Sequence, residues 1–211
     1  MKLKLALFTT VLAFAGMAHA QGIVSNLSIG AGFEGLFPAA TFTRAQTLAN
    51  FTAGGTQSST NSIGAVADLR YDFGRHSAVG FSFTFNRNTE YFVTANVDNN
   101  HVQTNNAEMI GTYIFRLPSN ERVKPFALFG GGMVRFTPNN DFVTTGTPST
   151  ETKPAFAYGF GTDFKLSDHW SLRMQYRGLV RADPDFKLTP AFGTALRAHV
   201  PEPSIQAVYH F

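Results

Sequence analysis

The chain alternates between apolar and polar residues over most of its length, and this two-residue period limits the folds open to it. Between Ala78 and Arg87, for example, every second residue is Val or Phe, and the residues between them are mostly Gly, Ser, Thr or Asn. A β-strand places successive side chains on opposite faces, so the pattern predicts strands with one apolar and one polar face. No segment has the apolar stripe or the capping box of a helix. The sequence therefore predicts an all-β protein.

Eight runs of this kind are found, and the connections between them alternate in length. The runs lie near Asn26–Phe37, Ser62–Phe73, Ala78–Arg87, Gln103–Phe115, Pro125–Phe136, Ala155–Leu166, Trp170–Arg177 and Ser204–Phe211. The long connections are Pro38–Asn61, Asn88–His101, Thr137–Lys153 and Gly178–Glu202, and the short ones are Gly74–His76, Arg116–Val123 and Ser167–His169. Long loops at one end and tight turns at the other are typical of a closed up-and-down antiparallel β-barrel in an outer membrane. We predict such a transmembrane barrel, since the runs also bracket the roughly 9–11 residues of a tilted membrane strand.

The length of the chain sets the number of strands. About 190 residues remain after a cleaved leader, so eight strands receive about 24 residues each with their connections. Sixteen strands would leave about 12 residues each, too few for four long loops, which excludes a general porin. Ten strands are reached if a long loop hides a hairpin, and Val93–Val97 and Phe142–Thr145 are the candidates.

Residues 1–20 have the features of a cleaved secretory signal peptide. Lys2 and Lys4 precede an apolar stretch, and Ala18-His19-Ala20 forms a small-x-small cleavage site. The apolar stretch is shorter than the roughly 20 residues of a membrane-spanning helix. We expect cleavage after Ala20, which leaves residues 21–211 as one barrel domain with 15 basic and 14 acidic residues. This nearly neutral balance removes the electrostatic support for a nucleic-acid partner.

If the apolar faces meet lipid, the opposite faces fill the barrel interior with charged residues. The predicted lumen network consists of Glu34, Asp68, Arg70, Asp72, Glu108, Arg135, Asp163, Lys165, Arg173 and Arg177. An unpaired buried charge is costly, and acids and bases are balanced here, so we expect them to pair. An eight-stranded barrel is only wide enough for side chains to fill it, which favours a rigid plug of salt bridges. The alternative is a gate, in which Arg135 or Arg177 changes partner and opens a narrow water path.

The outward aromatic residues are expected to form two girdles at the membrane interfaces. Aromatic rings with a polar edge are favoured where hydrocarbon gives way to lipid headgroups. The girdle at the short-turn end comprises Tyr71, Phe73, Phe115, Trp170, Tyr209 and Phe211, and the girdle at the long-loop end comprises Phe37, Phe85, Phe136, Phe156 and Tyr176.

The end of the chain adds a resemblance to a known superfamily. Ile205, Ala207, Tyr209 and Phe211 share one face, and the chain stops on an aromatic residue inside a strand. This ending resembles the C-terminal signature of outer-membrane β-barrel proteins, and Tyr158–Arg177 looks like the late hairpin of the small OmpA/OmpX/opacity-type barrels. The resemblance implies recognition of the last strand by the barrel-assembly machinery. We further expect both chain ends to lie in the periplasm.

Candidate catalytic and cofactor motifs lack the context that they need. Gly30–Gly35 matches G-x-G-x-x-G, yet Pro38 and a polar loop follow where a dinucleotide site requires a helix. We interpret these glycines as small inward residues of a strand. His169-Trp170-Ser171 is similar to the His-x-Ser pair of lipid A deacylases, but it lies at a short turn and not at the opposite end. With no cysteine and scattered histidines, the chain predicts no catalytic site, no metal site and no cofactor.

The leading functional hypothesis is a non-enzymatic structural or surface-interaction role for a monomer. Its expected partners are outer-membrane lipid and lipopolysaccharide, and no nucleic acid. Residues of the first and fourth loops that could make such contacts are Phe42, Leu48, Phe51, Arg181, Phe186, Lys187, Phe192 and Arg197. The alternative is a narrow passive diffusion channel gated by the lumen salt bridges, and a lipid A-modifying enzyme is the third hypothesis.

Overall fold

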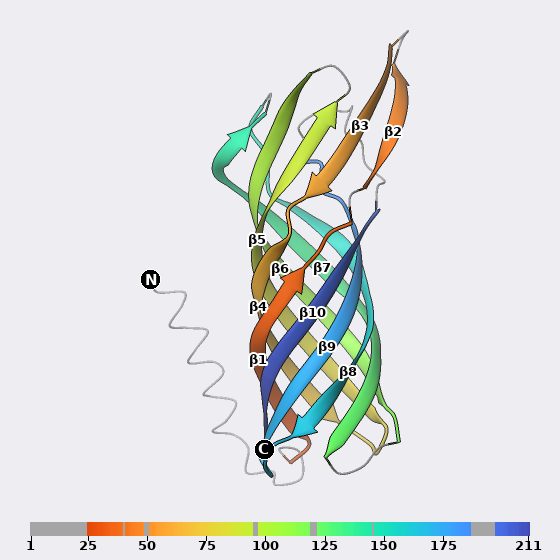
Figure 1. The fold of residues 1–211 in the computed structure, drawn as a ribbon, viewed down its shortest axis with the longest axis vertical. Helices are drawn as coiled ribbons and strands as arrows, with labels where there is room; N and C mark the ends of the chain where they lie inside the picture. The colour runs from red at the N-terminus through yellow and green to blue at the C-terminus, as the bar shows by residue number, and fades with distance from the viewer. Residues whose placement is uncertain are drawn as a thin grey trace.

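The computed structural model consists of antiparallel β-strands that form a barrel, with each strand tilted relative to the barrel axis (Figure 1). It describes residues 25–39, 41–48, 51–94, 97–118, 122–144, 146–186 and 197–211. The strands are β1 (Leu27–Leu36), β2 (Thr41–Leu48), β3 (Phe51–Ser59), β4 (Ser62–Asp72), β5 (Ser77–Thr94), β6 (Val97–Arg116), β7 (Val123–Val143), β8 (Glu151–Lys165), β9 (Trp170–Ala182) and β10 (Arg197–His210). No helix in these ranges is long and apolar enough to cross a membrane, a finding that does not concern strands.

Eight of the described strands close the barrel. Around the wall the order is β5-β4-β1-β10-β9-β8-β7-β6, and β6 pairs again with β5. β1 pairs with β10 from Ser28 opposite His210 to Glu34 opposite Ser204, so no free edge is left between them. A closed sheet satisfies the backbone hydrogen bonds of its wall internally, as lipid requires. The predicted closed up-and-down barrel of eight strands is confirmed.

The other two strands form a hairpin in the first long loop. β2 pairs with β3, and β3 also pairs with β5, from Gly55 opposite Thr94 to Ser59 opposite Glu90. In Figure 1 this hairpin, drawn in orange, projects beyond the barrel wall. The predicted positions of a hidden hairpin were wrong. Strands β5 and β6 pair as far as Thr94 opposite Val97, and the segment that begins at Phe142 is the end of β7.

At the long-loop end the strands extend well past the boundaries that alternation predicted. β5 runs to Thr94 and β6 begins at Val97, so most of the connection predicted at Asn88–His101 is strand. Likewise β7 continues to Val143 and β9 continues to Ala182. These extensions are held by cross-strand hydrogen bonds, which do not depend on an apolar face. Alternation missed them because the extensions of β5, β6 and β7 carry polar residues on both faces, and the extension of β9 carries apolar residues on both faces.

The register around the barrel sets the tilt of the strands. From Arg135 of β7, successive register partners run through Ala107 of β6 and Phe85 of β5, around the wall, and back to Pro125 of β7. This stagger between residues 135 and 125 fits a strand tilt of about 40°. Each step from β7 toward β5 therefore also moves toward the short-turn end.

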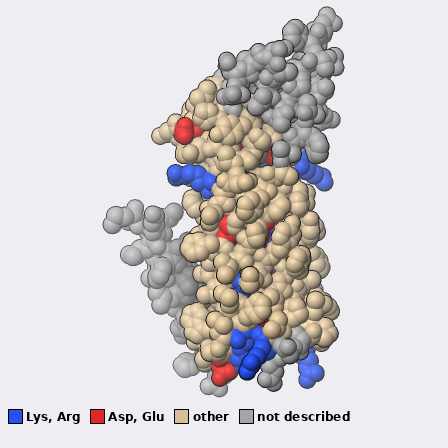
Figure 2. All heavy atoms as spheres, viewed as in Figure 1, with Lys and Arg blue, Asp and Glu red and all other residues tan. Residues whose placement is uncertain are grey.

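The phenylalanine-rich faces point outward and the charged faces point inward, as the alternation predicted. Phe33 is 67% exposed and Phe160 is 65% exposed, whereas Glu34 and Arg177 are each 1% exposed inside the barrel. In Figure 2 the side of the barrel is mostly free of charged atoms, which protrude at its bottom end and near the level where strands project. An apolar outer band around an ionic interior is the arrangement that a bilayer imposes on a barrel.

β7 has the opposite orientation to the one that its weak alternation suggested. Phe126, Leu128, Val134 and Phe136 are buried in the interior, and Arg135 is exposed on the outer wall. The predictions that placed Arg135 in the lumen and Phe136 in an outer girdle were therefore wrong. The strand carries apolar residues on both faces, so periodicity alone did not decide which face turns inward.

Two inward arginines contact the aromatic rings that β7 places in the charged interior. The guanidinium carbon of Arg70 lies 4.4 Å from the centre of the Phe126 ring, and that of Arg181 lies 4.6 Å from the Phe136 ring. Cation–π attraction makes a ring face a favourable neighbour for a desolvated guanidinium. Gly161 of β8 leaves room for the first ring, since a Cβ there would stand 2.6 Å from Phe126.

Candidate functional site

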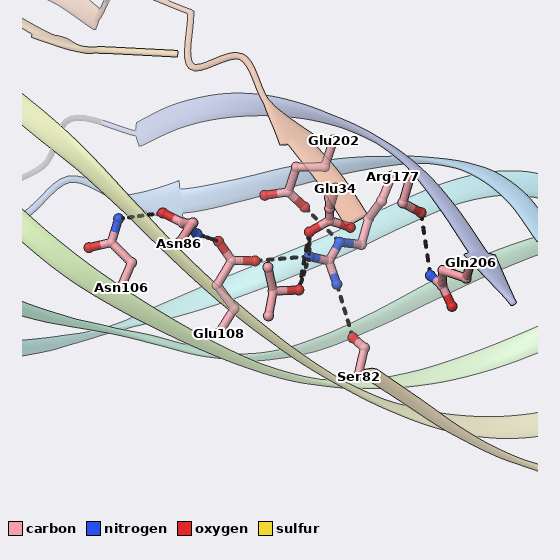
Figure 3. A network of polar contacts seen from close by, with 10 residues as sticks. Glu34, Ser82, Asn86, Asn106, Glu108, Arg177, Glu202 and Gln206 are labelled. Carbon is pink, nitrogen blue, oxygen red and sulfur yellow. Dashed lines mark hydrogen bonds and ion pairs between the residues drawn. The ribbon is translucent and has the colours of Figure 1, made fainter. Parts of the chain in front are cut away.

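Arg177 of β9 lies at the centre of the barrel and contacts several other strands (Figure 3). Its Nε donates to Glu202 of β10 at 2.6 Å, and its Nη2 donates to Glu34 of β1 at 2.9 Å and to Glu108 of β6 at 2.8 Å. Its Nη1 donates to Ser82 of β5 at 2.9 Å. β5 is opposite β9 in the strand order, so this last contact crosses the whole interior. We call Arg177, Glu34, Glu108 and Glu202 the Arg177 cluster.

The Arg177 cluster contains more carboxylates than cations. Glu34, Glu108 and Glu202 each offer an oxygen within 4.8 Å of the others, a spacing that would suit a metal ion. Arg177 already takes one oxygen of each, so its guanidinium is the cation of this site. Among the described residues, Glu34 Oε2 and Glu202 Oε1 are buried with no hydrogen-bond partner. Because these carboxylates depend on a single cation, the cluster is sensitive to its loss.

A second group of charges lies nearer the short turns. Arg173 of β9 donates to Asp163 of β8 at 2.7 Å and to Asp68 of β4 at 3.3 Å. Arg70 of β4 donates to the same Asp163 at 3.5 Å. All four residues belong to the predicted lumen network, and the structure brings them into contact with one another inside the barrel. Such paired, hydrogen-bonded charges are the form in which a barrel interior tolerates ionic groups.

Two further predicted lumen residues lie at the edge of the interior. Asp72 pairs with Arg116 at 2.7 Å, and both side chains are partly exposed. Lys165 was predicted to join the lumen network, but it is exposed and pairs with Asp168 of the adjoining turn at 2.8 Å. Lys165 is the last residue of β8, at the short-turn end of the interior, where its amine reaches a carboxylate of the adjoining turn.

A row of amide side chains leads from the Arg177 cluster toward the long loops. Asn106 donates to Asn86 at 2.9 Å and to Asn88 at 2.7 Å. Asn88 in turn donates to Glu90 at 3.2 Å, and Glu90 also accepts from Arg181 at 3.3 Å. Figure 3 shows the beginning of this row beside Glu108. The row links Arg177 and Arg181 through hydrogen-bonded side chains, and within the described residues Asn106 Oδ1, Glu90 Oε2 and Arg181 Nε are buried without a hydrogen-bond partner.

Phe186 closes the interior at the long-loop end. Its ring is buried and meets the rings of Phe92 and Phe136 edge-on, with centroid distances of 6.1 and 6.5 Å. Its φ of 51° lies in the left-handed region, which a bulky residue adopts only where packing imposes it. Phe186 and Arg181 were predicted to lie on a surface loop, and this was wrong, because both are buried. The side chains of Phe42, Leu48, Phe51, Lys187 and Phe192 lie outside what the structure describes.

Polar contacts fix the segment that carries Phe186. The backbone N and the Oγ of Ser149 donate to the Phe186 carbonyl at 3.2 and 3.3 Å, and the Asp185 backbone N donates to Glu151 at 3.0 Å. Glu151 begins β8 at the long-loop end, beyond the membrane-spanning part of the strand. Partial burial, followed by its hydrogen bond with the Asp185 carboxyl, raises the pKa of Glu151 above its ordinary value. This cap is therefore an acidic contact that strengthens when it carries a proton.

The predicted network missed Glu90, Arg116, Arg181 and Glu202, which the structure brings into ionic contact. All four were assigned to connections between strands. A signal for Glu202 exists, since the alternation of β10 continues backward from Ser204 through Glu202 and Val200. Pro201 and Pro203 obscured it, because proline normally argues against a strand. Here both prolines occupy outward positions of β10, so the inward row is unbroken.

The histidine and serine of His169-Trp170-Ser171 do not pair with each other. Ser171 Oγ lies 3.0 Å from Nε2 of His210, and His169 Nδ1 lies 3.0 Å from the backbone oxygen of His210. Gly30 and Gly32 occupy inward positions of β1, as interpreted from the sequence, but Gly35 occupies an outward position beside Phe37 and Pro203. Neither motif has the geometry of the site that its pattern suggested.

The short-turn end carries an outward aromatic cluster around the last strand. The Tyr209 ring lies 5.8 Å from His169, 5.2 Å from Trp170 and 5.1 Å from Phe211 between ring centres. Of the remaining predicted outward residues, Phe73, Phe115, Ile205 and Ala207 are exposed, and Tyr71 and Tyr176 are partly exposed. Their location at membrane interfaces, and the recognition of β10 during assembly, stay predictions.

A closed eight-stranded barrel with an apolar outer band and a cross-linked ionic interior defines an integral outer-membrane protein of the small-barrel class. The chain belongs to the outer membrane protein beta-barrel domain family, whose model matches residues 6–195. Membership of this family assigns the chain to the outer membrane. No curated protein sequence matches the chain.

Solved structures show the same fold at low sequence identity. The outer membrane protein OprG from Pseudomonas aeruginosa superposes with a TM-score of 0.66 at 11% identity, over 90% of this chain and 97% of OprG. AlkL, solved by solid-state NMR in lipid bilayers, gives 0.52 at 16% identity over 87% of this chain and 90% of AlkL. Ail, the attachment invasion locus protein of Yersinia pestis, in complex with the heparin analogue sucrose octasulfate, gives 0.50 at 19% identity over 88% and 97%.

Proposed function

We propose that this protein is a non-enzymatic, monomeric barrel whose role is structural, holding its projecting strands and loops at the cell surface for contact with other envelope components. The observation that carries the proposal is the bridge from Arg177 to Ser82 on the opposite wall, at 2.9 Å. A diffusion channel needs a continuous water path, and this bridge lies across that path. The buried ring of Phe186 adds a second obstruction at the long-loop end.

The proposed orientation places the short-turn end in the periplasm and the projecting strands outside. β1 and β10 meet at Ser28 and His210 beside the short turns, so both ends of the described barrel lie there. Barrels of this class have short periplasmic turns and longer external loops.

Conductance in planar bilayers tests the closed interior. We expect the folded protein to leave the membrane current at its baseline, because the Arg177 cluster and Phe186 block the lumen at two levels. A variant with Arg177→Ser, Glu34→Ser and Phe186→Ala removes these two obstructions, and its current should exceed that of the wild type if these two levels keep the lumen closed. Arg75→Ser, in an exposed short turn, is the matched control. Reproducible current steps from the wild-type barrel would instead establish the channel hypothesis.

The absence of cysteine makes orientation easy to test. Single cysteines are introduced at Thr147, exposed at the long-loop end, and at Ser167, exposed in a short turn. A membrane-impermeant maleimide should label Thr147→Cys on intact cells and Ser167→Cys only after the outer membrane is permeabilised. The reverse labelling pattern contradicts the proposed orientation.

A further inference from the structure

Arginines stand on the outer wall of the barrel at the long-loop end. Arg87 of β5, Arg135 of β7 and Arg197 of β10 are exposed, although neighbouring outward positions on the same strands are apolar or uncharged. Figure 2 shows Lys and Arg side chains protruding on both sides of the barrel near the level where strands project. Outward charge on a barrel is unfavourable within hydrocarbon and becomes tolerable only near the interface. These arginines therefore mark one edge of the membrane-embedded wall.

The register brings Arg87 and Arg135 to the same height. Arg135 shares a row with Ala107 and Phe85, and each strand crossed from β7 to β5 descends by about 3 Å toward the short-turn end. Arg87 lies two residues beyond Phe85 in the opposite direction, which raises it by about 5 Å along the axis. The two arginines thus stand side by side across β6, about 10 Å apart at the backbone.

Among the residues that the structure describes, no carboxylate pairs with either of these two cations. Arg87 Nε donates to Asn105 Oδ1 at 2.8 Å, which holds the guanidinium against the wall but leaves its charge uncompensated. Within the described residues, the Arg135 side chain has no ion-pair or hydrogen-bond partner. The outward residues beside the pair are Phe85, Ala107, Thr137 and Thr152, none of which is charged. Because none of these neighbours is charged, the two guanidinium groups are available to an anionic ligand at the membrane surface.

We propose that Arg87 and Arg135 form a binding site for the phosphate groups of the outer-leaflet glycolipid, lipopolysaccharide. Guanidinium groups bind phosphate oxygens in pairs of charge-assisted hydrogen bonds, and they are desolvated more readily than ammonium groups. Phe85, two residues nearer the short turns and 49% exposed, would contact the first part of the acyl chains. The inference rests on the proposed orientation, because only an outward long-loop end brings this edge to the outer leaflet.

The test measures binding of bis-phosphorylated lipid A to the full folded barrel in detergent, by native mass spectrometry. The double variant Arg87→Gln, Arg135→Gln should bind lipid A at least about tenfold more weakly, because charge-assisted hydrogen bonds are lost. Arg75→Gln should bind like the wild type, and the double Arg→Lys variant should fall between. Gel mobility before and after boiling verifies folding, and Arg135→Gln alone supplies the measurement if the double variant does not fold.

Three results would overturn the site. They are equal affinity of the double variant and the wild type, equal binding of dephosphorylated lipid A, and equal displacement by phosphatidylglycerol, which would indicate any anionic lipid. Failure of the proposed orientation is seen separately. Cysteine labelling that places Thr147 in the periplasm would remove the outer-leaflet ligand while leaving the measured lipid affinity unchanged.

Discussion

Arg177 and Glu202 face each other as register partners on β9 and β10, and the Arg177 Nε donates to Glu202 Oε2 at 2.6 Å. The same guanidinium serves Glu34 and Glu108 from strands far away in the sequence. One cation therefore contacts three buried carboxylates, and the stability of the barrel depends on it more than on any exposed ion pair.

Replacement of Arg177 by Met should destabilise the barrel by about 3–5 kcal/mol, because three buried carboxylates lose their cation. Urea unfolding in lipid vesicles measures the change, and Arg75→Met should alter stability by no more than about 0.5 kcal/mol. Adding Glu34→Gln, Glu108→Gln and Glu202→Gln to Arg177→Met should recover part of the loss. If Arg177→Met were as stable as the wild type, the three buried carboxylates would not depend on the positive charge of Arg177.

Substitution of Gly161 by Ala should destabilise the barrel by about 1–3 kcal/mol through overpacking. A Cβ at this position would stand 2.6 Å from the Phe126 ring and 2.7 Å from the Met174 carbonyl oxygen. Gly131→Ala is the matched control, since its nearest neighbour is the Ala155 oxygen at 3.4 Å. Phe126→Leu should partly rescue Gly161→Ala in the same urea assay. Equal effects of the two glycine substitutions would argue against the ring contact.

The cap formed by Glu151 and Asp185 should become tighter as the pH falls. The pKa of Glu151 is raised in the folded cap, chiefly by burial, so its protonated form favours the folded state. The added stability is complete below the ordinary carboxyl value and is lost as pH rises through the raised pKa. Amide exchange at Ser149 and Asp185 between about pH 4 and 7 reports this change, after correction for intrinsic rates.

Glu151→Gln should remove this pH dependence, while Asp168→Asn at the opposite end should leave it intact. A pH response that survives in Glu151→Gln would assign the effect to another group of the cap.

Replacement of Phe211 by Ala should lower the amount of folded barrel in the outer membrane of living cells. Phe211 packs edge-on against Tyr209 at 5.1 Å and ends the outward row of β10. If the assembly machinery reads this row, Phe211→Ala impairs assembly in cells but leaves refolding from urea into vesicles nearly normal. Phe156→Ala, an outward ring on β8, is the control for lost apolar surface. Equal losses from the two variants would mean that the chain end has no special part in assembly.

The alternating pattern was enough to predict the barrel, the number of its strands and the direction in which most side chains point. It succeeds for strands such as β5, where Phe81, Phe83 and Phe85 alternate with small polar residues, because lipid and lumen select opposite side chains. It failed for the polar strand extensions, because their pairing depends on backbone hydrogen bonds that no side-chain pattern records. It also failed for Glu202, which the outward prolines of β10 concealed.

The sequence by itself determined which residues of most strands face lipid and which face the interior, because a bilayer requires an apolar side chain at every second residue. Tertiary structure alone decided the orientation of β7, the partners of Arg177 and the burial of Phe186. Arg135 lies on the outer wall because Phe126 and Phe136 point inward, where their rings contact guanidinium groups of strands distant in sequence. Contacts of that kind exist only after the sheet has closed, because closure first brings β9 opposite β5.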